Sequence, residues 1–456
     1  MLYRVLRWAA SVALRWYYRD IEMIGADRLP PHAPLLLAGN HPNALVDALV
    51  ICAVVGRPIR LTAKATLAAH PALRLLFRAL GIVPLRRASD EAERTGLPPD
   101  PERNVAAFRA VLDALERRDA LLVFPEGRSH SEPQLAPLRT GLARMALQAR
   151  DERGIRDVSI VPIGLTFECK WEPRSAILVV IGEPLAVDDW PVGVEALTAA
   201  IDGALRGVTL NFPTDTEASD VLGIARTLSA VYDAPRPLGA PHTPLARAFD
   251  IARRVEELRG SIDALPLALK DRAGLLRHRL HVFERELAAR DIPINDLDIS
   301  TGARPALRFL LREAAILALV GPVALWGRLN HWLPLRAARW RARRSSRDPD
   351  DPATHTIATA FMLVTLAYAV QAAIVWRLGG PWWAFAYLTS LPASATWDFR
   401  LRDRTQRAAR RMRTWLQLRM DPALASRLRD EAAWLRAEAL AIENRATARA
   451  TAEQPG

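Results

Sequence analysis

Cysteine is nearly absent from this chain: two residues, Cys52 and Cys169, occur in a sequence of 456. Each lies in an apolar stretch, and neither belongs to a group of cysteines and histidines at zinc-ligand spacing. This scarcity argues against a disulfide framework and against a metal site, and no cofactor is expected. We expect two reduced thiols in the core of a protein that faces the cytosol.

Acidic residues are too few to balance the basic ones, and the formal net charge at pH 7 is +12. Arginine carries nearly all of the basic charge. Such an excess suits either nucleic acid or an anionic membrane surface. No nucleic-acid-binding motif is recognised, and the arginine clusters flank apolar segments. The composition therefore predicts membrane lipids as partners and argues against nucleic acid.

Charged side chains are missing altogether from two long segments, 353–376 with 24 residues and 378–397 with 20. Each segment is long enough to cross about 30 Å of hydrocarbon, which predicts two transmembrane spans. A shorter uncharged run, Ala314–Gly327, contains Pro322. This run is short for a span and predicts a re-entrant segment over 314–333.

Arginine clusters decide the expected orientation of these spans. Six arginines lie between Arg336 and Arg347, and seven lie between Arg400 and Arg413. A two-helix hairpin places both clusters on one side of the bilayer, and the positive-inside rule makes that side cytoplasmic. The expected location is therefore the cell membrane, with the N-terminal domain on its cytoplasmic face.

The N-terminal segment has an amphipathic pattern. Helical spacing places Arg4, Arg7 and Arg15 on one face, and apolar and aromatic residues fill much of the rest. This pattern predicts an interfacial membrane helix over 1–20. The alternative is a helix that packs on the core of its own domain.

Short apolar runs alternate with stretches of helical periodicity between residues 21 and 214, as is typical of an α/β domain. The predicted strands are Leu35–Ala38, Ile59–Thr62, Ile82–Val83, Ala120–Phe124, Val158–Ile163 and Ile177–Ile181. A helical insert over 215–304 follows, and a basic helical tail covers 398–456. The predicted fold is thus an α/β domain, a helical region, a membrane region over 305–397 with transmembrane helices, and a tail.

Four polar blocks occur in order along the predicted strands. In the first, Asn40–Asp47, a loop and the start of a helix can bring a carboxylate back to the imidazole of a histidine. The second, Gly81–Arg87, presents cations, the third is Phe124–His130, and the fourth is Val161–Gly164. Each block alone is commonplace, since most His–Asp pairs are structural and a double arginine is usually a solvated face. Together they indicate an acid–base pair beside a phosphate site.

These blocks resemble those of the glycerophosphate and lysophosphatidate acyltransferases, over about residues 30–185. The resemblance implies that His41 is the general base on an acceptor hydroxyl and that Asp47 orients it. It also implies that the acceptor site contains Asn40, Lys64, Arg86, Glu126, Gly127 and Arg128. The acyl group passes directly from acyl-CoA to the acceptor in this family, without an acyl-enzyme.

Two features depart from the family pattern. Five residues separate His41 from Asp47, one more than usual, which is closer to the subgroup that acylates glycerol 3-phosphate or dihydroxyacetone phosphate. Arg128 precedes Ser129, whereas the family has a small residue followed by an arginine, so either Arg128 or Arg139 supplies the phosphate contact.

The expected function is membrane-bound acyl transfer from acyl-CoA to glycerol 3-phosphate in phospholipid biosynthesis, with the catalytic domain on the cytoplasmic face. Lysophosphatidate and dihydroxyacetone phosphate are the alternative acceptors. The non-enzymatic alternative is a membrane scaffold that retains the fold. A scaffold has no reason to keep His41, Asp47, Arg86 and Glu126 together.

Overall fold

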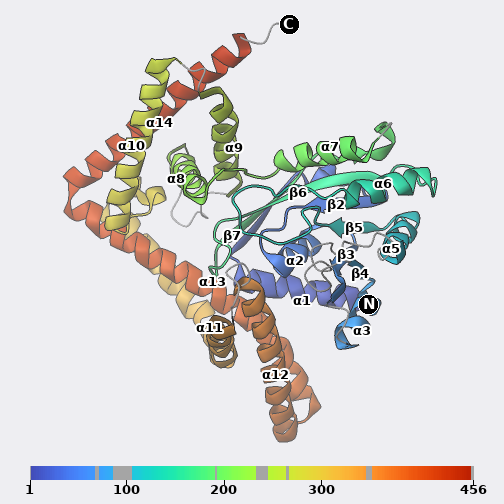
Figure 1. Cartoon of the computed structure of the whole chain (residues 1–456). Helices are drawn as coiled ribbons and strands as arrows, with labels where there is room; N and C mark the ends of the chain where they lie inside the picture. Colours follow the sequence, from blue (N-terminus) through green and yellow to red (C-terminus); the bar gives the residue numbers. More distant parts are fainter. Residues whose placement is uncertain are drawn as a thin grey trace. The chain divides into compact units, whose positions relative to one another are not determined.

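The computed structural model describes residues 2–66, 71–85, 105–190, 193–232, 245–262, 266–345 and 352–452. They form two compact units, Met1–Thr214 with Arg341–Thr359, and Asp215–Trp340 with Ala360–Gly456. The first unit contains the predicted α/β domain, and the second is helical (Figure 1). The predicted fold class is confirmed.

An eight-stranded sheet forms the centre of the first unit, with the order β1-β7-β6-β2-β5-β3-β4 and with β8 paired to β6. Its strands are β1 (Asp20–Ile24), β2 (Leu35–Gly39), β3 (Ile59–Lys64), β4 (Val83–Leu85), β5 (Ala120–Val123), β6 (Ser159–Phe167), β7 (Ala176–Ile181) and β8 (Leu185–Ala186). The structure confirms the six predicted strands and adds β1 and β8. Because β6, β2, β5, β3 and β4 are parallel, their carboxyl ends meet at one edge.

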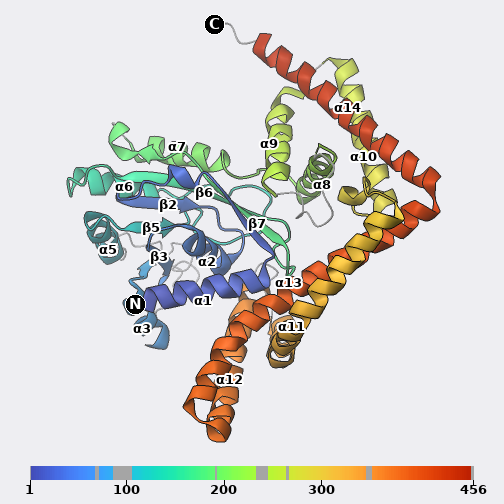
Figure 2. The ribbon, with the colours of Figure 1, turned by 180° about the vertical axis from the view of Figure 1, so that it is seen from behind.

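Helices cover both faces of this sheet (Figure 1, Figure 2). One face carries α1 (Leu2–Tyr17) and α2 (Ala44–Val54), and the other carries α5 (Val105–Glu116), α6 (Gly141–Asp151) and α7 (Val194–Arg206). Alternation along β2 serves both layers: Leu35 and Leu37 join a core with Val46 of α2, whereas Leu36 points to the opposite face. All of these leucines are fully buried, so β2 is fixed at the centre of the domain.

Helix α1 is packed on one side and open on the other. Leu14 is buried, and the guanidinium of Arg7 donates to the carbonyl of Val55, where α2 ends, at 2.7 Å. Val5 and Trp8 remain 51% and 60% exposed. The helix therefore packs on its own domain, as the alternative interpretation predicted, and its contact with a membrane surface stays a prediction.

Both cysteines are free thiols. Cys52 is buried in α2, and burial raises the pKa of its thiol to about 11. Cys169 is only partly buried. The expectation of a core thiol is therefore correct for Cys52 and wrong for Cys169.

The first unit also contains α3 (Pro71–Leu80), and the second unit contains the helices from α8 onward, apart from the end of α11 and the start of α12. They are α8 (Asp215–Tyr232), α9 (Leu245–Ile262), α10 (Leu267–Ala289), α11 (Ala303–Ser345), α12 (Pro352–Gly379), α13 (Pro381–Met420) and α14 (Pro422–Ala452). Leu280 and Phe283 of α10 share one core with Leu428 and Leu435 of α14. The predicted insert and tail are therefore parts of one unit and not separate domains.

The membrane region differs from its prediction in two respects. Helix α11 is unbroken over 314–333, although Pro322 lies inside it, so the predicted re-entrant segment is wrong because re-entry needs a reversal of the chain. Two helices among the described residues, Ala303–Arg341 and Thr354–Gly379, are long and apolar enough to cross a membrane. The run 378–397, most of which lies in α13, is not one of them.

Candidate active site

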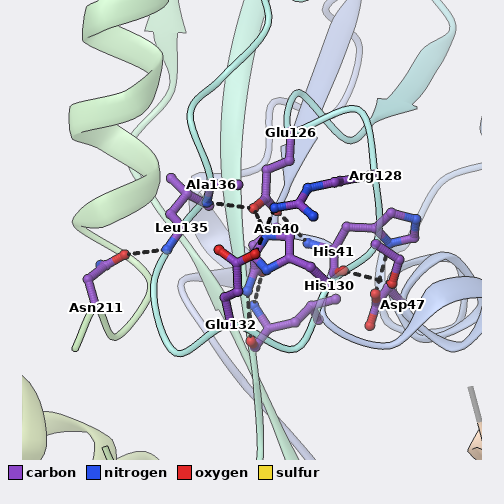
Figure 3. Close-up of polar contacts among 12 residues, drawn as sticks. Asn40, His41, Asp47, Glu126, Arg128, His130, Glu132, Leu135, Ala136 and Asn211 are labelled. Carbon is purple, nitrogen blue, oxygen red and sulfur yellow. Dashed lines mark hydrogen bonds and ion pairs between the residues drawn. The ribbon is translucent and has the colours of Figure 1, made fainter. Parts of the chain in front are cut away.

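The loop after β2 carries the predicted acid–base pair (Figure 3). His41 Nδ1 lies 2.9 Å from Asp47 Oδ2. Asp47 is fully buried in the first turn of α2, and His41 is 8% exposed. An ionised Asp47 accepts the hydrogen of Nδ1, which leaves the lone pair of Nε2 available for a proton. The structure thus brings together the two residues that the sequence predicted as catalytic.

The carboxyl group of Asp47 is held in a dry environment. Burial raises the pKa of Asp47, and hydrogen bonds from His41 and from the Asn43 main-chain nitrogen, at 2.7 Å, oppose this shift. The Asn43 side chain donates in turn to the hydroxyl of Tyr18 at 3.1 Å. Tyr18 was not predicted as part of the site, because it lies far from Asp47 in the sequence and at the start of the domain.

The loop after β5 holds the main chain of His41 from both sides. Glu126 Oε1 accepts the His41 N–H at 2.8 Å, and the N–H of His130 donates to the His41 carbonyl at 3.1 Å. Phe124 stacks on the imidazole, with ring centroids 3.9 Å apart and planes inclined by 7°. These contacts fix both the position and the plane of the imidazole.

Ser129 links His41 to the start of α2. Its Oγ donates to the His41 carbonyl at 3.0 Å and accepts the N–H of Ala44 at 3.0 Å. Ala44 has φ +44°, a left-handed conformation that costs a residue other than glycine about 1–2 kcal/mol. Ser129 and His130 were not predicted as functional, and the available signal was their place directly after Gly127 in the third block.

Glu126 is buried and holds the main chain of His41. It is 4% exposed, and its Oε2 accepts the N–H of Ala136 at 2.9 Å and a hydrogen from the His130 ring (Figure 3). Gly127, with φ +76°, makes the turn that directs this side chain inward. Both carboxylate oxygens accept hydrogens from the protein, and the predicted role of Glu126 in acceptor binding stays a prediction.

Asn40 is also part of the framework. Its side-chain amide accepts the N–H of Leu165 at 2.7 Å and donates to the carbonyl of the same residue at 3.1 Å. These bonds extend the pairing of β2 with β6 by one side chain. The amide thus holds the residue before His41 in place, and the binding of substrate by Asn40 stays a prediction.

Three basic residues were predicted to bind the acceptor, and the structure describes the side chain of only one of them, Arg128. Arg128 is exposed and pairs with Glu132 at 2.7 Å (Figure 3). Lys64 is the last residue of β3, at the same edge of the sheet as His41, and its side chain lies outside the described part of the chain. Arg86 follows β4 and lies outside the described residues altogether.

Arg139 was left open as an alternative to Arg128. Its main-chain N–H donates to the carbonyl of Pro125 at 2.8 Å, which ties it to the third block. Its Cγ lies against Gly127, where an added Cβ would come within 3.4 Å. The side chain is exposed, and no carboxylate pairs with it among the residues that the structure describes. Arg139 is thus the better placed of the two for an anion.

Comparison with known proteins was made for the whole chain. Residues 20–166 match the family model described as Acyltransferase. Glycerol-3-phosphate O-acyltransferase 2 of Saccharomyces cerevisiae is 35% identical over 134 residues, which are 27% of this chain and 18% of that protein. Glycerol-3-phosphate O-acyltransferase 1 of the same yeast is 22% identical over 265 residues, 41% of this chain and 35% of that protein.

Two further proteins are similar to parts of this chain. An uncharacterized acyltransferase of Schizosaccharomyces pombe is 22% identical over 315 residues, 50% of this chain and 46% of that protein. The crystal structure of the 1-acyl-sn-glycerophosphate acyltransferase PlsC from Thermotoga maritima has a TM-score of 0.35 and 19% identity, over 45% of this chain and 78% of that chain. The matches span less than half the length of each yeast relative. Residues 20–166, which contain most of the α/β domain, thus match an acyltransferase domain, and two of the similar proteins are glycerol-3-phosphate O-acyltransferases.

Proposed function

We propose that this chain transfers a fatty acyl group from acyl-CoA to a hydroxyl of glycerol 3-phosphate, at the cytoplasmic face of the cell membrane. The observation that carries the proposal is the buried contact of 2.9 Å between His41 and Asp47, braced on both sides by the third block. The similarity to two glycerol-3-phosphate O-acyltransferases of yeast supports this acceptor. Lysophosphatidate and dihydroxyacetone phosphate remain the alternative acceptors.

His41 is the proton carrier of the proposed reaction. Its Nε2 takes the proton of the acceptor hydroxyl while the oxygen attacks the thioester carbonyl. The new C–O bond forms, the C–S bond breaks, and the leaving CoA thiolate takes the proton back from His41. General base catalysis of this kind contributes about 10²–10⁴-fold to the rate. The scheme uses acyl-CoA as a co-substrate and no metal or other cofactor.

The acceptor phosphate needs cations at the carboxyl ends of the parallel strands. We propose that three residues bind the phosphate: Lys64, the last residue of β3, Arg86, which follows β4 in the sequence, and Arg139, which lies beside the third block. Arg128 has a smaller part, because its guanidinium already pairs with Glu132. Arginine suits this role because it offers two parallel hydrogen bonds to phosphate oxygens.

A non-catalytic scaffold is a poor explanation of the same geometry. Asp47 Oδ1 is buried and has no hydrogen-bond partner within the described part of the chain. A carboxylate in such a place destabilises the fold, and an apolar residue packs there at lower cost. A protein that uses His41 as a base gains from this carboxylate, because it orients the imidazole, and this gain offsets the loss of stability.

The proposal is tested with purified membranes that contain the full chain. Labelled palmitoyl-CoA is supplied with glycerol 3-phosphate, dihydroxyacetone phosphate or lysophosphatidate in separate reactions, and the lipid formed is identified. We expect lysophosphatidate from glycerol 3-phosphate, and its loss in His41→Ala. The control is His32→Ala, which removes an exposed histidine of the same domain.

The phosphate contact is resolved in the same assay. Arg139→Gln should raise the KM for the acceptor about 10-fold, as expected when one charge-assisted hydrogen bond is lost, while the KM for acyl-CoA stays constant. Arg128→Gln is the matched variant and should raise the acceptor KM much less, because the guanidinium of Arg128 is paired with Glu132. Full activity in His41→Ala, or product only from another acceptor, contradicts the proposal.

A further inference from the structure

A pocket of about 330 Å³ lies along the edge of the sheet, at β4. The start of β4, the start of β3, α3 (Pro71–Leu80) and α5 line it. Since β3 and β4 run parallel to the central strands, this pocket is at their amino ends, whereas His41 follows the carboxyl end of β2. The pocket is therefore separate from the active site.

The lining of this pocket is strongly basic. Four guanidinium groups contribute to it, those of Arg60, Arg74, Arg78 and Arg117. The carboxylate of Asp119 forms ion pairs with two of them, Arg60 at 2.6 Å and Arg117 at 3.5 Å. Asp113 also lines the pocket and pairs with Arg153 at 3.3 Å. Arg78 forms no ion pair with another described residue, so its guanidinium is available to an anion such as phosphate.

Apolar surface adjoins these cations. Phe77 and Val83 form a buried floor within the pocket. Leu75 projects from α3 and is 70% exposed. Helix α1 contacts α3 and leaves Val5 and Trp8 exposed, so two neighbouring helices present exposed apolar side chains. A basic pocket with an exposed apolar border matches a ligand that has a charged head and a hydrocarbon chain.

We propose that this pocket binds the phosphate of an anionic phospholipid, with Arg78 and Arg117 as its main contacts. The acyl chains lie along the exposed apolar side chains of α3 and α1. A soluble phosphate ester uses the guanidinium groups alone and has no use for the exposed Leu75. The site is distinct from the acceptor site, and its occupation does not depend on the proposed acyl transfer.

The test uses the full chain in a neutral detergent with a photoactivatable short-chain phosphatidic acid. Saturating glycerol 3-phosphate is present throughout to occupy the acceptor site, and crosslinked peptides are identified by mass spectrometry. We expect crosslinks within Phe77–Pro84. The double variant Arg78→Gln/Arg117→Gln should reduce them about 10-fold, because charge-assisted hydrogen bonds to the phosphate are lost.

Three controls make the result decisive. Arg109→Gln removes an exposed arginine of α5 that does not line the pocket, and it should leave the crosslinks unchanged. Equal labelling by a phosphatidylcholine probe overturns the proposal, because it shows that the negative headgroup is not recognised. Complete loss of labelling with equimolar inorganic phosphate also overturns it, because the ligand is then a free anion. Circular dichroism of the double variant verifies its fold.

Discussion

At the scale of single residues, Asp47 combines complete burial with a charge that the proposed reaction needs. Its partners are His41 and the Asn43 N–H, while Oδ1 is left without a hydrogen bond from the described residues. Desolvation raises the pKa of this carboxyl group above its ordinary value. The residue therefore weakens the fold at neutral pH while it selects the imidazole tautomer that can accept a proton.

Asp47→Asn separates these two effects. Because the pKa is higher in the folded state, the folded chain binds the proton more tightly, and the free energy of unfolding falls as pH rises from about 4. Asparagine does not titrate, so the variant should gain stability relative to the parent between about pH 4 and pH 7. Urea unfolding of the full chain at several pH values measures this difference.

The same variant should lose activity by about 10²–10⁴-fold. The Asn43 N–H and His41 Nδ1 both contact Oδ2, so the introduced amide oxygen accepts both hydrogens there, but the neutral amide no longer stabilises the imidazolium that forms when His41 takes a proton. Acyl transfer from labelled palmitoyl-CoA provides the readout. An active variant, or one whose relative stability falls with rising pH, is evidence against this account of Asp47.

The sequence predicted the contact between His41 and Asp47, because a loop followed by the first turn of a helix can bring the carboxylate back to the imidazole. It did not predict Ala44, whose left-handed conformation starts α2, because alanine gives no signal for positive φ. Nor did it predict that Glu126 and Asn40 hold main-chain groups of the site. A side chain near a catalytic base either faces the substrate or holds the main chain, and only the hydrogen-bond partners distinguish the two.

At the scale of elements, one loop positions another: the segment after β5 braces the segment after β2. Ser129 joins them by accepting from Ala44 and donating to His41. Ser131 lies in the same loop, and its buried hydroxyl has no partner among the described residues. The two serines form a matched pair for mutation.

Ser129→Ala should lower kcat about 10-fold or more, because even a shift of the base by a fraction of an ångström weakens catalysis. The acceptor KM should stay nearly constant, since the phosphate contacts are unchanged. Loss of the hydrogen bonds should reduce stability by about 1 kcal/mol. Ser131→Ala should retain kcat, and an equal loss in both variants indicates a general disturbance of the loop.

The boundaries of helices were harder to predict than the strands of the core. Continuous apolar runs such as Leu35–Ala38 indicate buried strands without further information. In contrast, the uncharged run 378–397 ends at Asp398, yet α13 continues to Met420. Asp398 is buried and paired with Arg328 of α11 and with Arg402, so the charge is accommodated inside the helix. Hydropathy marks the end of an apolar segment and not the end of a helix.

At the scale of the whole molecule, the membrane topology depends on which helices form the spanning pair. The apolar helices Ala303–Arg341 and Thr354–Gly379 meet the requirements of length and composition. Pairing α11 with α12, however, carries the six arginines between Arg336 and Arg347 to the far side of the membrane. Pairing α12 with α13 keeps both arginine clusters in the cytoplasm. We therefore favour a hairpin of α12 and α13, with α11 in the interface.

This topology predicts opposite exposures for two junctions. Gly380, with φ +85°, forms the turn between α12 and α13 and should lie on the far side of the membrane. An epitope inserted at Gly380 should react with antibody in intact cells, whereas epitopes between α11 and α12 and after Gly456 should react only after permeabilisation. Each tagged chain must first retain acyltransferase activity. If the epitope between α11 and α12 is the one that reacts in intact cells, α11 crosses the bilayer with α12, and charge placement has been outweighed by the apolar length of α11.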